Sequence, residues 1–216
     1  MILKLENVSY RYRKNGPEIL DGVSCEFERG KLYAVMGESG SGKTTLISVI
    51  AKLDRATGGA ILYGGADIAG MNGDEYRSRR VSVIFQSYNL LYNYTAADNV
   101  ATVLDVSGYL GGYGPRAAEL LAEVGIAEGK RGQVVQNLSG GEQQRVAVAR
   151  ALASGSEVIL ADEPTGNLDR GNSENVMQIF VGLARRHGKC VIIVTHSDFV
   201  AGYADHVLKL ENGRIV

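Results

Sequence analysis

The chain has 216 residues and a formal net charge of −1 at pH 7, and 45% of its residues are hydrophobic and 22% charged, a composition typical of globular domains. Its length suits one well-buried domain and is too short for two. The near-neutral charge disfavours a nucleic-acid-binding protein, and no run approaches the roughly 18 apolar residues of a membrane helix.

The N-terminal sequence MILKLENVSY lacks the basic start, long apolar core and cleavage site of a secretion signal. We therefore expect a cytoplasmic location. From the near-neutral charge we expect no nucleic-acid partner. Cys25 and Cys190 lie far apart in apolar segments without C-x-x-C spacing, so we expect both in the core. Arg77, Arg79 and Arg80 form the one basic cluster, which we interpret as a solvated face that could still meet a partner loop.

Short strands are predicted at the start of the chain. Leu3 and Leu5 alternate with charged residues, residues 8–13 and 19–28 flank a turn at 15–17, and residues 60–63 end at a Gly-Gly pair. These segments predict a small antiparallel β-layer beside the main core.

Residues 37–44 read GESGSGKT, which matches the phosphate-loop pattern G-x-x-x-x-G-K-[S/T]. Gly40 and Gly42 let the backbone approach phosphate oxygens, Lys43 reaches the β- and γ-phosphates, and the Thr44 hydroxyl can bind Mg²⁺. The alternative is a glycine-rich turn with an accidental lysine.

The flanking residues support the phosphate loop. An apolar, strand-like run at 31–36 precedes it, and Leu46, Val49, Ile50 and Leu53 follow with the spacing of one helix face. A helix N-terminus adds partial positive charge at such a loop. We expect ATP contacts from Gly37, Glu38, Ser39, Gly40, Ser41, Gly42, Lys43, Thr44 and Thr45.

The rest of the chain predicts a parallel sheet with a helical insert. Residues 81–85 form a buried-strand candidate that ends at Gln86, and helical patterns occur at 117–124 and 142–153. Strands at 158–161 and 190–195 flank a helix at about 175–186, which is the β-α-β pattern. Residues 207–216 predict a hairpin with an Asn-Gly turn.

Two carboxylates follow the strand at 158–161. At the carboxyl end of a strand in an α/β sheet, Asp162 would hold Mg²⁺ and Glu163 would orient and deprotonate the water that attacks the γ-phosphate. The alternative is a pair of exposed acids at a strand end. The phosphate loop favours the functional interpretation.

The stretch LSGGEQQR, at 138–145, has two interpretations that are compatible. Ser139 and Glu142 have the spacing of a helix capping box. The free N–H groups of a helix that starts at Gly140 and Gly141 would also bind phosphate. Because the loop at 37–44 already holds the nucleotide from one side, the simplest arrangement is a head-to-tail homodimer in which this surface covers the ATP of the partner chain.

LSGGEQQR between a phosphate loop and ILADE resembles the signature of ATP-binding-cassette (ABC) ATPases over essentially the whole chain. Three further stretches resemble the ATPase subunits of macrolide-exporter and lipoprotein-release systems. They are FQ at 85–86 followed by NLL, EPTGNLD at 163–169, and IIVTH at 192–196. The resemblance implies a P-loop NTPase of the α/β class with a RecA-like core, an antiparallel β subdomain and an α-helical signature subdomain. We expect core residues 1–89 and 152–216 and a helical subdomain at 90–151.

The resemblance also implies roles for single residues. Tyr12 lies where the family has an aromatic residue that stacks on adenine, with Tyr10 as a rival. Gln86 resembles the glutamine that senses Mg²⁺ and the attacking water while its loop contacts the membrane partner. Asp169 resembles the acidic residue that communicates across the dimer, although it could simply cap a helix. His196 resembles the histidine that contacts the γ-phosphate.

The family implies ATP and Mg²⁺ as cofactors and a transmembrane permease subunit as partner, which would hold the chain at the inner face of the membrane. The expected function is ATP hydrolysis that drives export or extraction; the alternative is an ATP-gated signalling or mechanotransmission module. Two features depart from the family pattern: residues 107–116 are rich in glycine, and Glu38 replaces a commoner proline.

Overall fold

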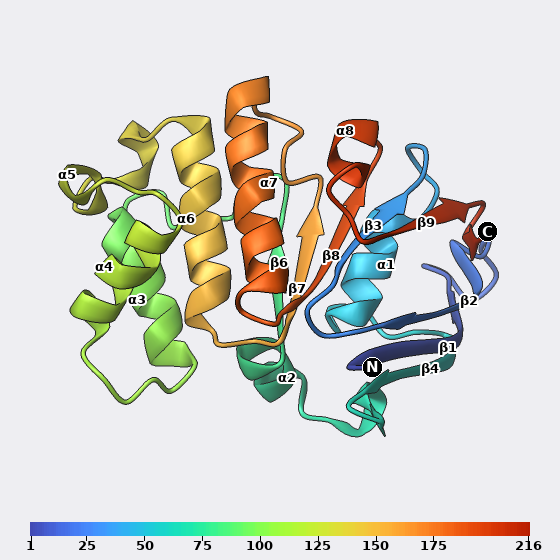
Figure 1. The fold of residues 1–216 in the computed structure, drawn as a ribbon. Coiled ribbons are helices and arrows are strands. Elements are labelled where there is room, and N and C mark those ends of the chain that lie inside the picture. The colour runs from blue at the N-terminus through green and yellow to red at the C-terminus, as the bar shows by residue number, and fades with distance from the viewer.

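The computed structural model describes residues 1–216, which form two sheets and a separate group of helices (Figure 1). A four-stranded sheet has the order β2-β1-β4-β5, and a six-stranded sheet has the order β10-β9-β3-β8-β7-β6. The first sheet consists of β1 (Leu3–Tyr10), β2 (Leu20–Phe27), β4 (Gly58–Tyr63) and β5 (Ala66–Asp67). The second consists of β3 (Leu32–Met36), β6 (Val81–Ile84), β7 (Val158–Asp162), β8 (Cys190–Thr195), β9 (His206–Glu211) and β10 (Arg214–Ile215).

The expected antiparallel β-layer is present, because β1 pairs antiparallel with both β2 and β4. In the larger sheet, neighbouring strands from β9 through β6 are parallel, and β10 returns as a hairpin on β9. Every residue of β7 and β8 is buried, as expected for parallel strands that are covered on both faces. The carboxyl ends of these strands therefore point toward the same edge of the sheet.

Different helices cover the two faces of the parallel sheet. Ile159 and Ala161 of β7 pack in one hydrophobic cluster with α6 (Gly140–Ala153) and α7 (Arg170–Arg185). Val158 and Leu160 pack in a second cluster with α1 (Lys43–Ile50), which lies between the parallel sheet and the β-layer (Figure 1). The alternation of side chains along a strand produces this division.

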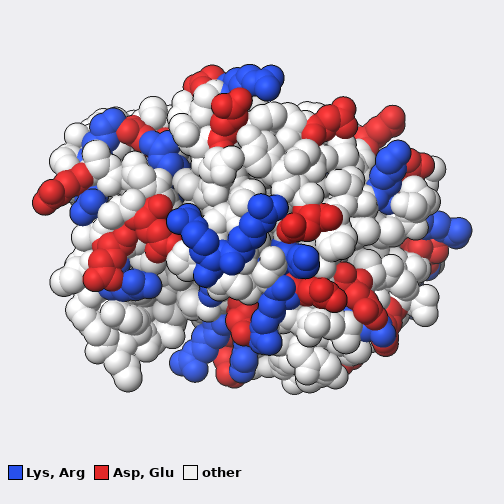
Figure 2. Space-filling model, in the orientation of Figure 1, with Lys and Arg blue, Asp and Glu red and all other residues white.

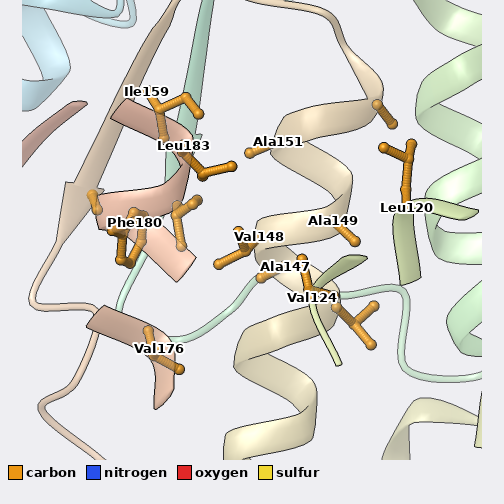
Figure 3. Close-up of a cluster of buried hydrophobic side chains, with 14 of the residues drawn as sticks. Leu120, Val124, Ala147, Val148, Ala149, Ala151, Ile159, Val176, Phe180 and Leu183 are labelled. Atoms are coloured by element: carbon orange, nitrogen blue, oxygen red, sulfur yellow. The ribbon is translucent and has the colours of Figure 1, made fainter. Parts of the chain in front are cut away.

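The helical subdomain lies on the side of the molecule away from the β-layer (Figure 1) and contains α3 (Ala96–Val106), α4 (Tyr113–Glu123), α5 (Glu128–Arg131) and α6. Helix α6 joins it to the core. Figure 3 shows Val148 on the side of α6 that faces Phe180 of α7, and Ala149 on the side that faces Leu120 of α4. All four side chains are buried, so α6 is held from both sides.

The structure corrects several details of the sequence prediction. Helix α1 ends at Ile50, so Leu53 lies beyond it and is exposed. The first strand ends at Tyr10 rather than at 13, because the chain turns at 12–16. Helix α2 (Gly73–Arg79), capped by the side chain of Asn72, was not predicted. Helix α7 starts at Arg170 rather than near 175 because the Asp169 side chain caps it. Cys190 is buried, but Cys25 is only partly buried because β2 is an edge strand.

Residues 107–112 of the glycine-rich tract form the turn between α3 and α4, and residues 113–116 form the first turn of α4. The side chain of Leu110 is fully exposed there, at 101%. Figure 2 shows Lys and Arg interspersed with Asp and Glu over most of the visible face, with an uncharged corner at the lower left, where α3 joins α4. None of the helices combines the length and the hydrophobicity that crossing a bilayer requires.

Replacing Gly59 with alanine should destabilise the β-layer more than the matched change at Gly64. Both glycines have positive φ, 74° and 58°, which costs a residue with a Cβ about 1–2 kcal/mol. A Cβ at Gly59 would also lie 2.3 Å from the carbonyl oxygen of Asn7, whereas at Gly64 it would meet nothing within 4 Å. We expect Gly64→Ala to lose about 1–2 kcal/mol and Gly59→Ala clearly more in urea unfolding; equal losses would contradict this packing.

Candidate functional site

The loop between β3 and α1 has the geometry that the sequence predicts. Gly40 and Gly42 have φ values of 84° and 103°, which favour glycine. A Cβ at Gly37 would lie 2.4 Å from the carbonyl oxygen of Leu210, and one at Gly42 would lie 2.8 Å from that of Ile19. No side chain caps the N-terminus of α1, so its first N–H groups are free to bind an anion.

A pocket of about 760 Å³ opens beside this loop. The Lys43 ammonium lies over the loop and donates to the carbonyl oxygens of Gly37 at 2.7 Å and Glu38 at 2.9 Å. The buried Ser41 hydroxyl has no hydrogen-bond partner. A cation without a carboxylate partner, free N–H groups and an unpartnered hydroxyl fit a polyphosphate. The pocket is lined by Tyr12, Ile19, Glu38, Ser39, Gly40, Gly42, Lys43, Thr44, Thr45, Gln86, Asp162, Glu163 and His196.

The residues around Asp162 fit a Mg²⁺ ion shared with phosphates. Burial raises the pKa of Asp162, and a hydrogen bond with Thr44 opposes this shift. The available ligands are hydroxyl, carboxylate and amide oxygens, and no group of three His, Cys, Asp or Glu side chains gathers here to hold a metal alone. Mg²⁺ commonly uses one or two carboxylates together with substrate phosphates.

Replacing Asp162 with asparagine should stabilise the nucleotide-free chain while removing Mg²⁺-dependent hydrolysis. The pKa of Asp162 is higher in the folded chain than in the unfolded chain. Stability is therefore lost as pH rises from the unfolded-state pKa through the folded-state pKa, and at pH 7 the ionised carboxylate lowers the free energy of unfolding. We expect a slightly higher unfolding temperature, on the order of 2 °C, by calorimetry without nucleotide. A lower unfolding temperature would contradict the assignment.

Glu163 is held in an unusual conformation at the edge of the pocket. Its φ is 45°, in the left-handed region, and its N–H donates to the carbonyl oxygen of Val194 at 3.0 Å. One carboxylate oxygen, Oε1, lies 2.6 Å from Nδ1 of His196, and the other, Oε2, accepts from the Thr195 hydroxyl at 2.9 Å. The structure thus places Glu163 and His196, predicted from separate motifs, in direct contact.

Gln86 and Tyr12 also line the pocket. The carbonyl oxygen of Gln86 accepts from the side chain of Asn167 at 3.4 Å, so its loop contacts the segment after Glu163. The Tyr12 hydroxyl lies 3.0 Å from Oγ1 of Thr45, and its ring is 66% exposed. Tyr10 is buried, which leaves Tyr12 as the tyrosine with a face free for a base to stack on.

The predicted capping box at the start of α6 is present. The Ser139 hydroxyl accepts from the N–H of Glu142 at 3.4 Å, and Oε2 of Glu142 accepts from the N–H of Ser139 at 3.0 Å. Hydrogen bonding from Lys130 lowers the pKa of Glu142. Ser139 and Gly140 are exposed, and no residue of 138–145 lines the pocket described above. The N-terminus of α6 is therefore open toward solvent and takes no part in the pocket beside the phosphate loop of its own chain.

The first turn of α7 packs against the start of α6. Asp169 accepts from the N–H of Asn172 at 2.9 Å and from its side-chain amide at 2.6 Å, and these hydrogen bonds lower the pKa of Asp169. A Cβ at Gly141 would lie 2.4 Å from Oδ1 of Asn172. Sequence reasoning missed Thr195 and Asn172; the position of Thr195 just before the histidine was the one available signal.

Comparisons with known proteins place these features in context. A family model described as "ABC transporter" matches residues 20–166. The chain is 38% identical to the uncharacterized ABC transporter ATP-binding protein YclH of Bacillus subtilis, over 98% of this chain and 94% of the relative. It is 37% identical to the lipoprotein-releasing system ATP-binding protein LolD 1 of Rhodopseudomonas palustris, over 99% and 98%.

A third relative, the macrolide export ATP-binding/permease protein MacB of Bradyrhizobium diazoefficiens, is 42% identical over the full chain, which spans 34% of that longer protein. Among solved structures, a dimeric post-hydrolysis state of the ATP-binding cassette MJ0796 bound to ADP and Pi matches with a TM-score of 0.88 and 33% identity, over 99% of this chain and 96% of the other.

Proposed function

This chain belongs to the ABC transporter family, and on that premise we propose that it hydrolyses Mg-ATP within a head-to-tail homodimer and so drives a separate transmembrane permease that exports or extracts a substrate. The observation that carries the proposal is the separation of the two phosphate-binding surfaces. The pocket presents Lys43, Asp162 and Glu163, while the capped helix at Ser139 lies outside it. A second copy of the chain would bring that helix to the open side of the nucleotide.

In the proposed mechanism, the loop N–H groups and Lys43 bind the β- and γ-phosphates, and Tyr12 stacks on the adenine. Thr44 and Asp162, with Gln86, would hold Mg²⁺, which when bound supplies positive charge that neutralises the phosphates. Glu163 accepts a proton from the water that attacks the γ-phosphorus in line, and the β–γ bridging oxygen leaves with ADP. The His196 side chain breaks its contact with Glu163 and then stabilises charge on the γ-phosphate from the exposed side of the pocket.

The Gln86 loop supplies a route from this site to a membrane partner. Phe85, Tyr88 and Asn89, on either side of Gln86, line a groove of about 400 Å³ between the core and the helical subdomain, together with Val103 and Val106 of α3. We place the permease contact in this groove, because the residues on either side of Gln86 help to line it. The partner would hold the chain at the cytoplasmic face of the membrane, and Asp169 would communicate between the two protomers.

The proposal is tested by reconstitution. The chain is co-purified with its membrane partner, the complex is placed in lipid vesicles, and substrate movement is followed beside phosphate release. Coupled movement and hydrolysis support a transport ATPase. ATP-dependent conformational change of the partner without movement of any substrate would favour a mechanotransmission module instead, and the absence of hydrolysis in the complex would contradict both.

A further inference from the structure

We propose that Thr195 is a positioning residue that fixes the carboxylate of Glu163 for its role as base. Thr195 is the last residue of β8 and is fully buried. Its hydroxyl lies 2.9 Å from Oε2 of Glu163, a contact between residues 32 positions apart. The inference rests on the proposed ATP hydrolysis and adds a residue to that site.

The carboxylate sets the direction of this hydrogen bond, and a second contact agrees with it. The N–H of Ser197 donates to the Thr195 oxygen at 3.1 Å. A hydroxyl has one proton to give, and an ionised carboxylate can only accept. The Thr195 hydroxyl therefore donates its one proton to Glu163 and uses a lone pair to accept from Ser197. Hydrogen bonds to a charged acceptor are stronger than neutral ones.

One carboxylate oxygen of Glu163 contacts a buried side chain, Thr195, and the other contacts an exposed side chain, His196. Thr195 is the last residue of the buried strand β8, whereas His196 lies just beyond the strand and its side chain is 70% exposed. The histidine can swing toward a phosphate, but the threonine is confined by the core. Once His196 leaves, Thr195 still occupies Oε2, and Oε1 is left as the oxygen that accepts the proton of the attacking water.

The backbone of Glu163 makes this support necessary. Its left-handed conformation, φ 45°, is disfavoured for a residue with a Cβ, and strained residues persist where surrounding contacts fix them. The N–H of Glu163 donates to the carbonyl oxygen of Val194, and the carboxylate of Glu163 accepts from the hydroxyl of Thr195. Val194 and Thr195 are adjacent residues of β8. The strand thus fixes both the main chain and the carboxylate of the base.

The test compares Thr195→Val with Thr195→Ser in the full chain, with its membrane partner where the partner is known. Valine keeps the shape but removes the hydroxyl, and we expect kcat for ATP to fall about 10- to 100-fold while KM and the affinity for ATP stay within about twofold. Serine, which keeps the hydroxyl, should restore most of the rate. Thr57→Val, which removes a hydroxyl bonded to the Ser9 carbonyl in the β-layer, is the matched control and should leave the rate unchanged.

A double mutant separates this role from a general structural one. In a Glu163→Gln background, Thr195→Val should lower the residual rate little further, because its effect acts through Glu163. A wild-type rate for Thr195→Val, a KM that rises as much as kcat falls, or an equal further loss in the Glu163→Gln background would each overturn the inference. Failure of the wild-type chain to hydrolyse ATP would instead refute the proposed function itself.

Discussion

Replacing Glu163 with glutamine should reduce ATP hydrolysis by about 100-fold or more and leave ATP binding intact. The amide keeps the size of the carboxylate and can still accept from the Thr195 hydroxyl, but it cannot take a proton from the attacking water. Lys43 is held by the carbonyl oxygens of Gly37 and Glu38 and not by Glu163, so the proposed phosphate contacts of the loop should survive the change. ATP should therefore accumulate uncleaved between two protomers and hold the dimer closed.

The measurement combines phosphate release with light scattering after size exclusion in Mg-ATP. The variant should elute as a dimer under conditions in which the wild-type chain returns to monomer. Glu119→Gln, a change at a surface ion pair with Arg116 on α4, is the control and should behave as wild type. Turnover at the wild-type rate in Glu163→Gln would remove Glu163 as the base.

The parts of the fold predicted best from sequence are those whose determinants are local. The phosphate loop needs glycines at fixed positions, and Gly40 and Gly42 adopt the expected positive φ. Ser139 and Glu142 form the expected capping box. Asn212 and Gly213, with φ of 48° and 78°, form the expected hairpin turn. In each case the residues that specify the geometry lie within a few positions of one another.

The missed contact between Thr195 and Glu163 depends on strand pairing across the sheet. Asp162 of β7 lies opposite Val194 of β8, and this register alone brings Thr195 to Glu163. No local pattern encodes a register between strands about 30 residues apart. Tyr10 and Tyr12 are a second ambiguous pair in the sequence, because both would lie on the same face of the strand predicted at 8–13. The end of β1 at Tyr10 buries one ring and frees the other.

Mixing a Lys43→Ala chain with a Ser139→Asp chain should restore hydrolysis that neither chain has alone. Lys43→Ala removes the cation at the β- and γ-phosphates. Ser139→Asp keeps an N-cap acceptor for α6 but places a negative charge where a phosphate would bind. Each homodimer then carries the same defect in both of its sites, so each should hydrolyse ATP at least about 100-fold more slowly than wild type.

The heterodimer distinguishes a shared site from a site within one chain. If Lys43 of one protomer and Ser139 of the other face the same nucleotide, one site receives both altered residues and the second receives two intact ones. With random pairing, half the dimers are mixed and half of their sites are whole, so an equal mixture should recover about a quarter of the wild-type rate. If Lys43 and Ser139 served the nucleotide of one chain, every site would keep one defect and mixing would recover nothing. Because the first residue of α6 lies outside its own pocket, we expect recovery, and its absence in a mixture shown to contain heterodimers would contradict the head-to-tail arrangement.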